Sequence, residues 1–397
     1  MSPELSVLLV SWNTREETSR CLRALHAGAT GLDYEVIAVD NASVDGSADL
    51  LAADPRVHLI TNRRNVGFAA AMNQARRRAR GELLLLLNSD VQVHPGALPT
   101  MLRFLREHPD AAGVSPRYLN PDGTFQQHYV QLPSLAACLA LFTVLRKVPG
   151  FRAALHRFQM RGEDFSVPRE LASGSCLLLR SGAVGATEIF DERFPVYWND
   201  AVLARQLTAA GHRTWMIPDA AVTHTRGASC RLLGPAMRYR HLLGSLMRYL
   251  RDTRPRYQCE VFRVVLVLDQ LLKSVLGRTT TLGWTDLLAA LRADTGPLPD
   301  GDTRDWEIVV DGLPATDRTD TRRLLVDTTG GSRRPRLTIQ QLDGSLWRAS
   351  MSNDRIGAAR LRRWLDGHAG ARTLRLDDRH RALARRLGHD VVVQRAG

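Results

Sequence analysis

The sequence lacks the cysteine arrangements that commonly hold small domains together. Its five cysteines are scattered and odd in number, and none belongs to a C-x-x-C pair: Cys21, Cys138, Cys176, Cys230 and Cys259. The pattern therefore indicates neither a zinc site nor a disulfide framework. Reduced thiols in a cytoplasmic setting are the expectation.

Long hydrophobic runs are missing as well. The longest uncharged apolar stretch, Leu135 to Leu145, is too short to span a bilayer. The N-terminus shows no basic segment followed by a long apolar one, so we expect no signal peptide. These absences predict a cytoplasmic protein.

Acidic residues are in deficit, with 41 Asp and Glu against 54 Lys and Arg and a formal net charge of +13. Excess positive charge favours anionic partners such as nucleotide phosphates, acidic lipid surfaces or nucleic acid. No nucleic-acid recognition motif is present, so we expect no nucleic-acid partner. A length of 397 residues allows two or three domains.

Strand and helix patterns alternate through the first ninety residues. Apolar runs predict strands over 5–10, 34–39, 57–60 and 83–87, with helices over 15–26, around 50–51 and over 68–80. The run of five leucines, 83–87, indicates a strand buried on both faces. This alternation predicts an α/β fold with a doubly wound, mostly parallel sheet.

Polar residues follow three of these strands, at Asn13, at Asp40 with Asn41, and at Asn88 with Asp90. Solvated loops explain polar strand ends in general. Ligands of open α/β sheets bind beyond the carboxyl ends of the strands, so three Asn- and Asp-rich ends favour a site there.

Later segments continue the α/β pattern. We predict helices over 95–108 and from Asp200, and strands over 176–179, 214–217 and 222–224. The weakly patterned segment 110–169, with a hairpin near 120–123 and a helical stretch near 135–146, has the length of a pocket wall or lid.

Six short motifs resemble those of the family 2 glycosyltransferases, inverting enzymes with the GT-A fold. They cover roughly residues 5 to 232 in the order found in that family: 39–46 (VDNASVDG), 65–73 (NVGFA through Asn73), 87–91 (LNSDV), 190–194 (FDERF), 197–200 (YWND) and 218–224 (PDA through His224). The pattern is most similar to bacterial rhamnosyltransferases and galactofuranosyltransferases that build lipid-linked glycans.

The resemblance implies a divalent cation on the donor diphosphate. It makes Asp90 the metal-binding carboxylate of the D-x-D element and His224 a further ligand, with Mn²⁺ slightly favoured over Mg²⁺ because imidazole suits manganese better. The first aspartate of D-x-D is Asn88 here, so we expect weak, substrate-assisted metal binding. The alternative for His224 is a structural histidine at a strand end.

The resemblance also makes Asp200 the catalytic base. The acidic residue that usually precedes it is Asn199, and a further acidic position two residues on is Val202, so Asp200 has no local substitute. The alternative is that Asp200 only caps its helix.

Further residues match nucleotide-sugar positions of the family. Asp40 matches the aspartate that contacts the base or ribose, Arg64 is placed to reach a phosphate, and Gly67 lets the backbone approach the ligand. The pocket itself is expected to include Asn13, Asn65, Asn73, Asn88 and Ser89. Trp198 either stacks on the acceptor sugar or belongs to the core.

The remainder divides in two, which gives expected domains of 1–232 (catalytic), 233–295 (a basic helical extension) and 296–397 (a small α/β module). The apolar stripe of 237–250 and the sparsely charged stretch 261–276 suggest a peripheral membrane surface. The alternative is that these apolar faces pack on the catalytic domain. We expect a combination, in which the helices pack on the domain and leave an arginine-rich face towards lipid. The module is predicted to have strands at 306–310, 323–326, 336–342, 346–351 and 391–394 and helices at 354–368 and 378–387.

The sequence thus predicts a metal-dependent inverting glycosyltransferase at the cytoplasmic membrane face. It would move a sugar, with dTDP-rhamnose as a candidate donor, to a lipid-linked or cell-envelope glycan. One rival keeps the chemistry on a soluble natural-product acceptor. Another is a pseudoenzyme that binds a nucleotide sugar without transfer, which Asn88, Asn199 and Val202 keep open. A homo-oligomer is compatible with either.

Overall fold

The computed structural model describes residues 2–126, 131–159, 169–170, 173–233, 235–276, 284–293 and 298, and four strands beyond them. The chain forms two compact units, residues 1–301 and 302–397. The first unit contains the candidate site. Whether it comprises two domains, divided near residue 232, stays a prediction.

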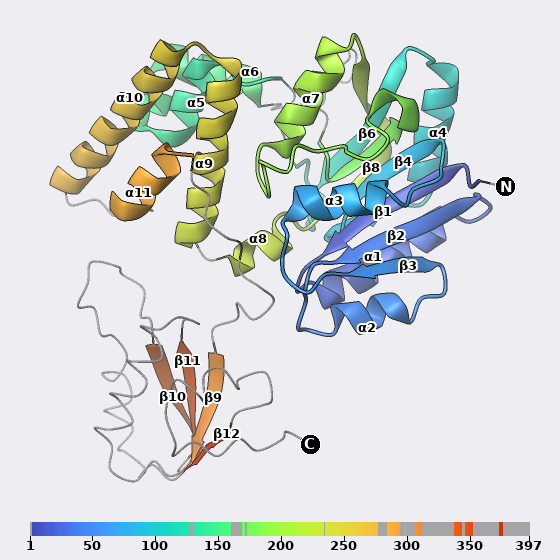
Figure 1. The fold of residues 1–397 in the computed structure, drawn as a ribbon, viewed down its shortest axis with the longest axis horizontal. Helices are drawn as coiled ribbons and strands as arrows, with labels where there is room; N and C mark the ends of the chain where they lie inside the picture. Colours follow the sequence, from blue (N-terminus) through green and yellow to red (C-terminus); the bar gives the residue numbers. More distant parts are fainter. Residues whose placement is uncertain are drawn as a thin grey trace. The chain divides into compact units, whose positions relative to one another are not determined.

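The first four long strands form the parallel part of an eight-stranded sheet (Figure 1). They are β1 (Leu5–Ser11), β2 (Tyr34–Asp40), β3 (Val57–Thr61) and β4 (Leu83–Asn88), joined by helices α1 (Arg15–Gly28), α2 (Ser47–Ala52) and α3 (Phe68–Arg76). β1 lies between β2 and β4, and all three contacts among these strands are parallel. The predicted alternation is confirmed, although α3 ends four residues before the expected position.

The other half of the sheet is mixed rather than parallel. β7 (Cys176–Arg180) runs antiparallel to β4, followed by β6 (Ala111–Leu119), β8 (Arg213–His224) and β5 (Val91–Val93) in the order β3-β2-β1-β4-β7-β6-β8-β5. The sequence-based prediction missed β5 and β6 and divided β8 into two strands. The division fell at 218–220. There Ile217 pairs with Pro116 and Ala221 pairs with Arg117, so the three residues between them bulge out of a continuous strand.

The leucine strand lies between two separate cores. Leu83, Leu85 and Leu87 face the core that contains α1 and α4 (Ala97–Glu107), whereas Leu84 and Leu86 face the one that contains α3. Since side chains alternate along a strand, an uninterrupted leucine run is what burial on both faces requires. The predicted burial is confirmed.

A helical cluster forms a third core beside the sheet. It contains α5 (Leu135–Phe142), α6 (Pro149–Phe158), α9 (Pro235–Thr253), α10 (Arg256–Val275) and α11 (Trp284–Leu291), and α7 (Asn199–Ala209) packs against it. The short helices η1 (Val144–Lys147), η2 (Ser181–Ala183) and α8 (Ala228–Leu232) complete the unit. Over the described residues, every helix is too short or too polar to cross a bilayer.

The apolar stripe predicted for 237–250 is buried in this cluster. Leu243, Leu246, Met247 and Leu250 of α9 are fully covered. The alternative of packing therefore holds for α9, and its apolar face is not available to a membrane.

The second unit is described only in its strands. β9 (Trp306–Asp311), β10 (Leu337–Asp343), β11 (Leu346–Met351) and β12 (Thr373–Arg375) form an antiparallel sheet in the order β10-β11-β9-β12. The predicted strands at 306–310, 336–342 and 346–351 are confirmed, and β12 was missed. The elements predicted at 323–326, 354–368, 378–387 and 391–394 lie outside the described residues.

Candidate active site

A cavity of about 500 Å³ opens beyond the carboxyl ends of β1 and β4. Three polar residues from different elements reach it: Asp90 after β4, His224 at the end of β8, and Asp200 in the first turn of α7. These three residues are widely separated along the chain, and the structure brings them to one cavity as the sequence predicted.

Asp90 and His224 form a buried pair. β5 pairs antiparallel with β8 so that Val91 lies opposite His224, which places the preceding Asp90 beside the imidazole. His224 Nε2 lies 3.3 Å from Asp90 Oδ1, and the Ala228 amide donates to Asp90 Oδ2 at 3.1 Å. Burial would raise the pKa of Asp90, but His224 and that amide outweigh it and hold the pKa below its usual value.

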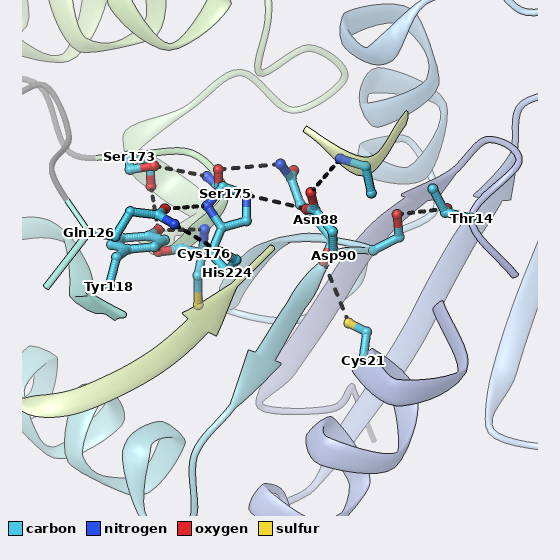
Figure 2. A network of polar contacts seen from close by, with 12 residues as sticks. Thr14, Cys21, Asn88, Asp90, Tyr118, Gln126, Ser173, Ser175, Cys176 and His224 are labelled. Atoms are coloured by element: carbon cyan, nitrogen blue, oxygen red, sulfur yellow. Dashed lines mark hydrogen bonds and ion pairs between the residues drawn. The ribbon is translucent and has the colours of Figure 1, made fainter. Parts of the chain in front are cut away.

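Gln126 fixes the orientation of the His224 ring (Figure 2). The Gln126 amide nitrogen donates to two carbonyl-type oxygens, the His224 backbone carbonyl and Asn120 Oδ1, so the other end of the amide is an oxygen. That oxygen, Oε1, lies 2.8 Å from His224 Nδ1. Nδ1 therefore carries the proton and donates it to Gln126.

This orientation leaves Nε2 facing the Asp90 carboxylate. In a neutral imidazole with its proton on Nδ1, Nε2 carries a lone pair. Two acceptors, Nε2 and the Asp90 carboxylate, would then face each other. A proton or a metal cation between them resolves the conflict, and carboxylate with imidazole is a donor set that suits Mn²⁺. No cluster of three His, Cys, Asp or Glu suited to a metal occurs among the described residues. Asp90 and His224 thus fit a cation whose other ligands come from a substrate or water.

Asp200 has the opposite electrostatic environment. Burial raises its pKa to about 6, and the Gly174 amide and the more distant His224 offset that rise only in part. A Cβ placed at Gly174 would lie 2.3 Å from Asp200 Oδ1, so only glycine leaves room for the carboxylate. The N-cap residue of α7 is Trp198, which makes no side-chain capping bond, and Asn199 Oδ1 rather than Asp200 accepts a first-turn amide. Capping therefore does not explain Asp200.

The turn that carries Gly174 is held by Tyr118 of β6. The buried Tyr118 hydroxyl accepts from the Cys176 amide at 2.7 Å and contacts the Cys176 and Ser173 carbonyls (Figure 2). In the same turn, the Ser175 carbonyl accepts the Asn88 amide at 2.9 Å. This bond joins the turn beside Asp200 to the end of β4, so the two sides of the cavity are rigidly connected.

Several predicted nucleotide-binding residues line or adjoin the cavity. Asn65, Gly67, Asn88 and Ser89 lie in its wall. Asn88 Oδ1 is buried and makes no hydrogen bond to the described residues. Gly67 has φ of +91°, and a Cβ added there would lie 2.9 Å from Pro195 Cβ. A side chain at Gly67 is therefore excluded by Pro195, and the approach of its backbone to a ligand stays a prediction.

Asp40 and Asn13 lie just behind the cavity wall. The Asn13 side chain accepts from the Val44 amide, and the Asn13 backbone amide donates to Ser43. Asp40 accepts from the Ser43 amide through one oxygen, and its second oxygen is buried without a partner among the described groups. Burial raises the pKa of Asp40 despite the Ser43 contacts.

Three predicted contacts lie elsewhere. Asn73 is fully buried and binds the backbone of Ile189 and Phe190, so it anchors a loop. Arg64 is exposed outside the cavity wall. Trp198 donates to the Leu242 carbonyl and stacks on Phe158 and Tyr249, which makes it a core residue that holds the left-handed start of α7.

The sequence-based prediction missed Gln126 and three arginines of the cavity. Arg226 from the loop after β8, Arg231 from α8 and Arg238 from α9 also line it. Arg226 follows His224 by two residues, and that proximity was an available signal. Gln126 gave no signal, because it lies in a segment without recognisable pattern and reaches His224 only through the fold.

Comparison with known proteins finds similarity to glycosyltransferases. Residues 6–179 match the model of glycosyl transferase family 2. The chain is 29% identical over 253 residues to N-acetylglucosaminyl-diphospho-decaprenol L-rhamnosyltransferase of Mycobacterium tuberculosis, which covers 58% of this chain and 78% of that protein. It is 35% identical over 114 residues to the succinoglycan biosynthesis protein ExoO of Rhizobium meliloti, covering 28% of this chain and 31% of ExoO.

The solved structures that are similar to this chain have lower sequence identities. The mannosyltransferase PcManGT from Pyrobaculum calidifontis, in complex with GDP-Man and Mn²⁺, has a TM-score of 0.44 at 18% identity and covers 73% of this chain and 79% of its own. TarS of S. aureus with UDP-GlcNAc has a TM-score of 0.44 at 14% identity and covers 74% and 88%. The α/β fold expected from the sequence is confirmed, with a sheet that is mixed in its second half. Over residues 6–179 the chain is thus similar to glycosyl transferase family 2, the family that its motifs resemble.

Proposed function

We propose that this glycosyltransferase moves a sugar from a nucleotide diphosphate to a hydroxyl of a lipid-linked glycan, with inversion at the anomeric carbon. The observation that carries the proposal is the convergence of the Asp90–His224 pair and Asp200 on one cavity. The two groups divide the work, since one side is suited to the departing diphosphate and the other to the acceptor.

The diphosphate side is formed by Asp90, His224 and the arginines. With Mn²⁺ or Mg²⁺ bound, the cation would neutralise charge that develops on the departing diphosphate. Asp90 and His224 would hold it, and Gln126 would keep the imidazole lone pair directed at it. Arg226, Arg231 and Arg238 would add positive charge to the cavity.

The acceptor side centres on Asp200. The acceptor oxygen attacks the anomeric carbon, its proton passes to Asp200, and the bond from that carbon to the diphosphate oxygen breaks. A pKa of about 6 keeps Asp200 ionised at neutral pH yet makes it a stronger base than an ordinary aspartate. Asn199 and Val202 leave it as the single base of this helix turn.

The nucleotide is proposed to lie along the ends of β1, β2 and β4. Asn65, Asn88 and Ser89 line that wall, and the unpartnered oxygens of Asn88 and Asp40 are acceptors for ligand donors.

The donor and acceptor are proposed from the M. tuberculosis relative. That protein's name specifies a rhamnosyl donor and an N-acetylglucosaminyl-diphospho-decaprenol acceptor. We therefore place dTDP-rhamnose first among donors and a polyprenyl-diphosphate-linked sugar first among acceptors, with the reaction at the cytoplasmic face of the membrane.

A two-stage experiment tests this function. Thermal unfolding with a panel of nucleotide sugars, with and without Mn²⁺, should show a rise in the melting temperature for dTDP-rhamnose that requires the cation. Incubation of that donor with N-acetylglucosaminyl-diphospho-polyprenol should then add one deoxyhexose by mass spectrometry. Transfer to a soluble acceptor alone would replace the acceptor class, and binding without any transfer or donor hydrolysis would indicate a pseudoenzyme.

A further inference from the structure

Helix α10 exposes a continuous apolar stripe, which we call the outer stripe of α10. Its members recur every three or four residues, so they lie on one face of the helix. Their exposure is unusual for large apolar residues and reaches 57% at Leu268 and 83% at Val275. The outer stripe consists of Tyr257, Val261, Val264, Leu268, Leu271 and Val275.

The opposite face of α10 is ordinary core. Cys259, Phe262 and Leu266 are buried in the helical cluster. Charged residues of the helix also turn inward or sideways: Asp269 is buried and accepts the Val144 amide at 2.7 Å, and Arg263 reaches the Leu291 carbonyl. The helix thus exposes an uncharged apolar face to solvent, where a surface helix usually has charged and polar residues.

The extent of the outer stripe argues against chance. Single exposed apolar residues are normal, but a contiguous patch marks a contact surface. Twenty residues of α-helix extend about 30 Å. The described neighbours extend the apolar character, because Leu272 and Leu276 at the end of α10 and Leu288 of α11 are also about half exposed.

The segments packed around α10 are rich in positive charge. η1 lies beside α10 through the bond from Val144 to Asp269. Residues 135–159, which include η1 and α6, contain Arg146, Lys147, Arg152 and Arg157 and no Asp or Glu. Residues 235–276 contain eight Arg and Lys and three Asp and Glu. The helical cluster that carries the outer stripe therefore has a strong excess of positive charge.

We infer that the outer stripe of α10 is inserted at the surface of an anionic membrane, with the η1 and α6 cations on lipid headgroups. An apolar helix face with basic flanks is the arrangement that lies in the plane of such an interface. The inference rests on the proposed function in one respect: a lipid-linked acceptor is the reason for the enzyme to bind a membrane.

Charge favours a lipid surface over a second copy of the chain as the partner. A two-fold contact through α10 would bring the same η1 and α6 cations of both copies together. Like charges brought together oppose such a contact, whereas anionic headgroups neutralise them. The surface lies on the second of the two stretches that suggested membrane contact, 261–276, whereas the apolar stripe of 237–250 is buried.

Vesicle co-sedimentation of the full chain tests the inference. We expect binding to vesicles of phosphatidylcholine with about 30% phosphatidylglycerol at low salt, weaker binding at high salt, and little binding to pure phosphatidylcholine. The variant Val264→Asp/Leu268→Asp should lower the partition constant at least roughly tenfold. Both positions are exposed, so its melting temperature should match that of the wild type.

The matched control is Ala27→Asp/Ala52→Asp, which adds the same charge on exposed positions of α1 and α2. It should change the partition constant less than about twofold. An equal loss of vesicle binding in both variants would show that net charge alone determines binding, and it would overturn the inference. So would a wild-type dimer in light scattering that the α10 variant converts to a monomer.

Failure of this surface is separable from failure of the proposed function. Binding of dTDP-rhamnose with Mn²⁺, followed by thermal shift, uses the cavity and not the outer stripe. The α10 variant should keep that shift. If it does and vesicle binding is unchanged too, the membrane surface is wrong while the glycosyltransferase assignment stands.

Discussion

Asp90 and Asp200 line the same cavity, yet their surroundings act on them in opposite directions. His224 and an amide hold the pKa of Asp90 below its usual value although burial opposes this. Asp200 has one amide and a distant imidazole, and burial raises its pKa to about 6. The contrast comes from the neighbours, since burial acts to raise the pKa of both side chains.

The difference separates two chemical tasks that one residue type performs. A carboxylate with a lowered pKa stays ionised and suits a permanent cation ligand, whereas one with a raised pKa can accept a proton near neutral pH. The two environments therefore favour different roles, in agreement with the family resemblance. Variants of both carboxylates test this contrast, and the largest effect is expected at Asp200.

Replacing Asp200 should affect the rate most. Asp200→Asn keeps an oxygen for the Gly174 amide but cannot take a proton, so transfer should fall about 10²–10⁴-fold. The Mn²⁺-dependent thermal shift with donor should persist. Asp49→Asn, on the exposed surface of α2, is the matched control and should retain full activity. Transfer by Asp200→Asn at near wild-type rate would assign the base elsewhere.

Removing the support of His224 should affect the metal and leave the base intact. Gln126→Leu loses the acceptor that fixes the Nδ1 proton, so the affinity for Mn²⁺ in the presence of donor should fall roughly 10–100-fold. Saturating Mn²⁺ should restore most of the transfer rate. Rescue distinguishes a positioning role from general misfolding, and a rate that no Mn²⁺ concentration restores would contradict it.

The rate should depend on pH through Asp200. Below about pH 6 the base is protonated, so transfer at saturating donor and Mn²⁺ should fall about tenfold per pH unit. It should level off above about pH 7. Donor binding, followed by thermal shift at about pH 5 and pH 7.5, serves as the control. A flat profile between these values would contradict the assignment.

Stability should change in opposite directions at the two carboxylates. A raised folded-state pKa means that ionised Asp200 destabilises the fold, and this cost appears as pH rises from about 4 through 6. Asp200→Asn should therefore raise the free energy of unfolding at about pH 7.5 by on the order of 1–2 kcal/mol, with no gain below about pH 4.

Asp90 should behave in the reverse way. Its lowered pKa gives stability that is present above the unfolded value and is lost as pH falls through the folded one. Asp90→Asn should lower the free energy of unfolding at about pH 7.5 by about 1–3 kcal/mol, because the Ala228 amide and His224 lose a charged partner. Chemical denaturation of both variants at that pH measures the pair, and equal signs would remove the contrast.

The N-terminal half of the fold was predictable because its signals are local. Leucines 83–87 predicted a strand covered on both faces, and the predicted boundaries of β1, β2 and β4 fell within one residue of those observed. β6 was missed because Gly113 and Pro116 interrupt its apolar pattern. Its place is set instead by pairing with β7 and β8, which no local pattern encodes.

The site was predictable through motifs and not through geometry. Asp90, His224 and Asp200 reach one cavity as the motif order predicted. Asn73 and Trp198 belong to the same set of motifs, but their side chains bind backbone groups of the protein itself. The motifs mix residues that line the cavity with residues that hold loops, and sequence alone does not separate them. Helices α9 and α10 show the same limit, since similar apolar patterns are buried in one and exposed in the other.

The pairing of β5 with β8 has a consequence for how the enzyme matures. Asp90 and His224 become neighbours only when β8, the final strand of the sheet in chain order, pairs with β5, a three-residue strand much earlier in the chain. Such long-range contacts form late in folding, because a long loop must close first. A nascent chain that has not yet added residue 224 has no cation pair, so capture of Mn²⁺ would report completion of the entire sheet.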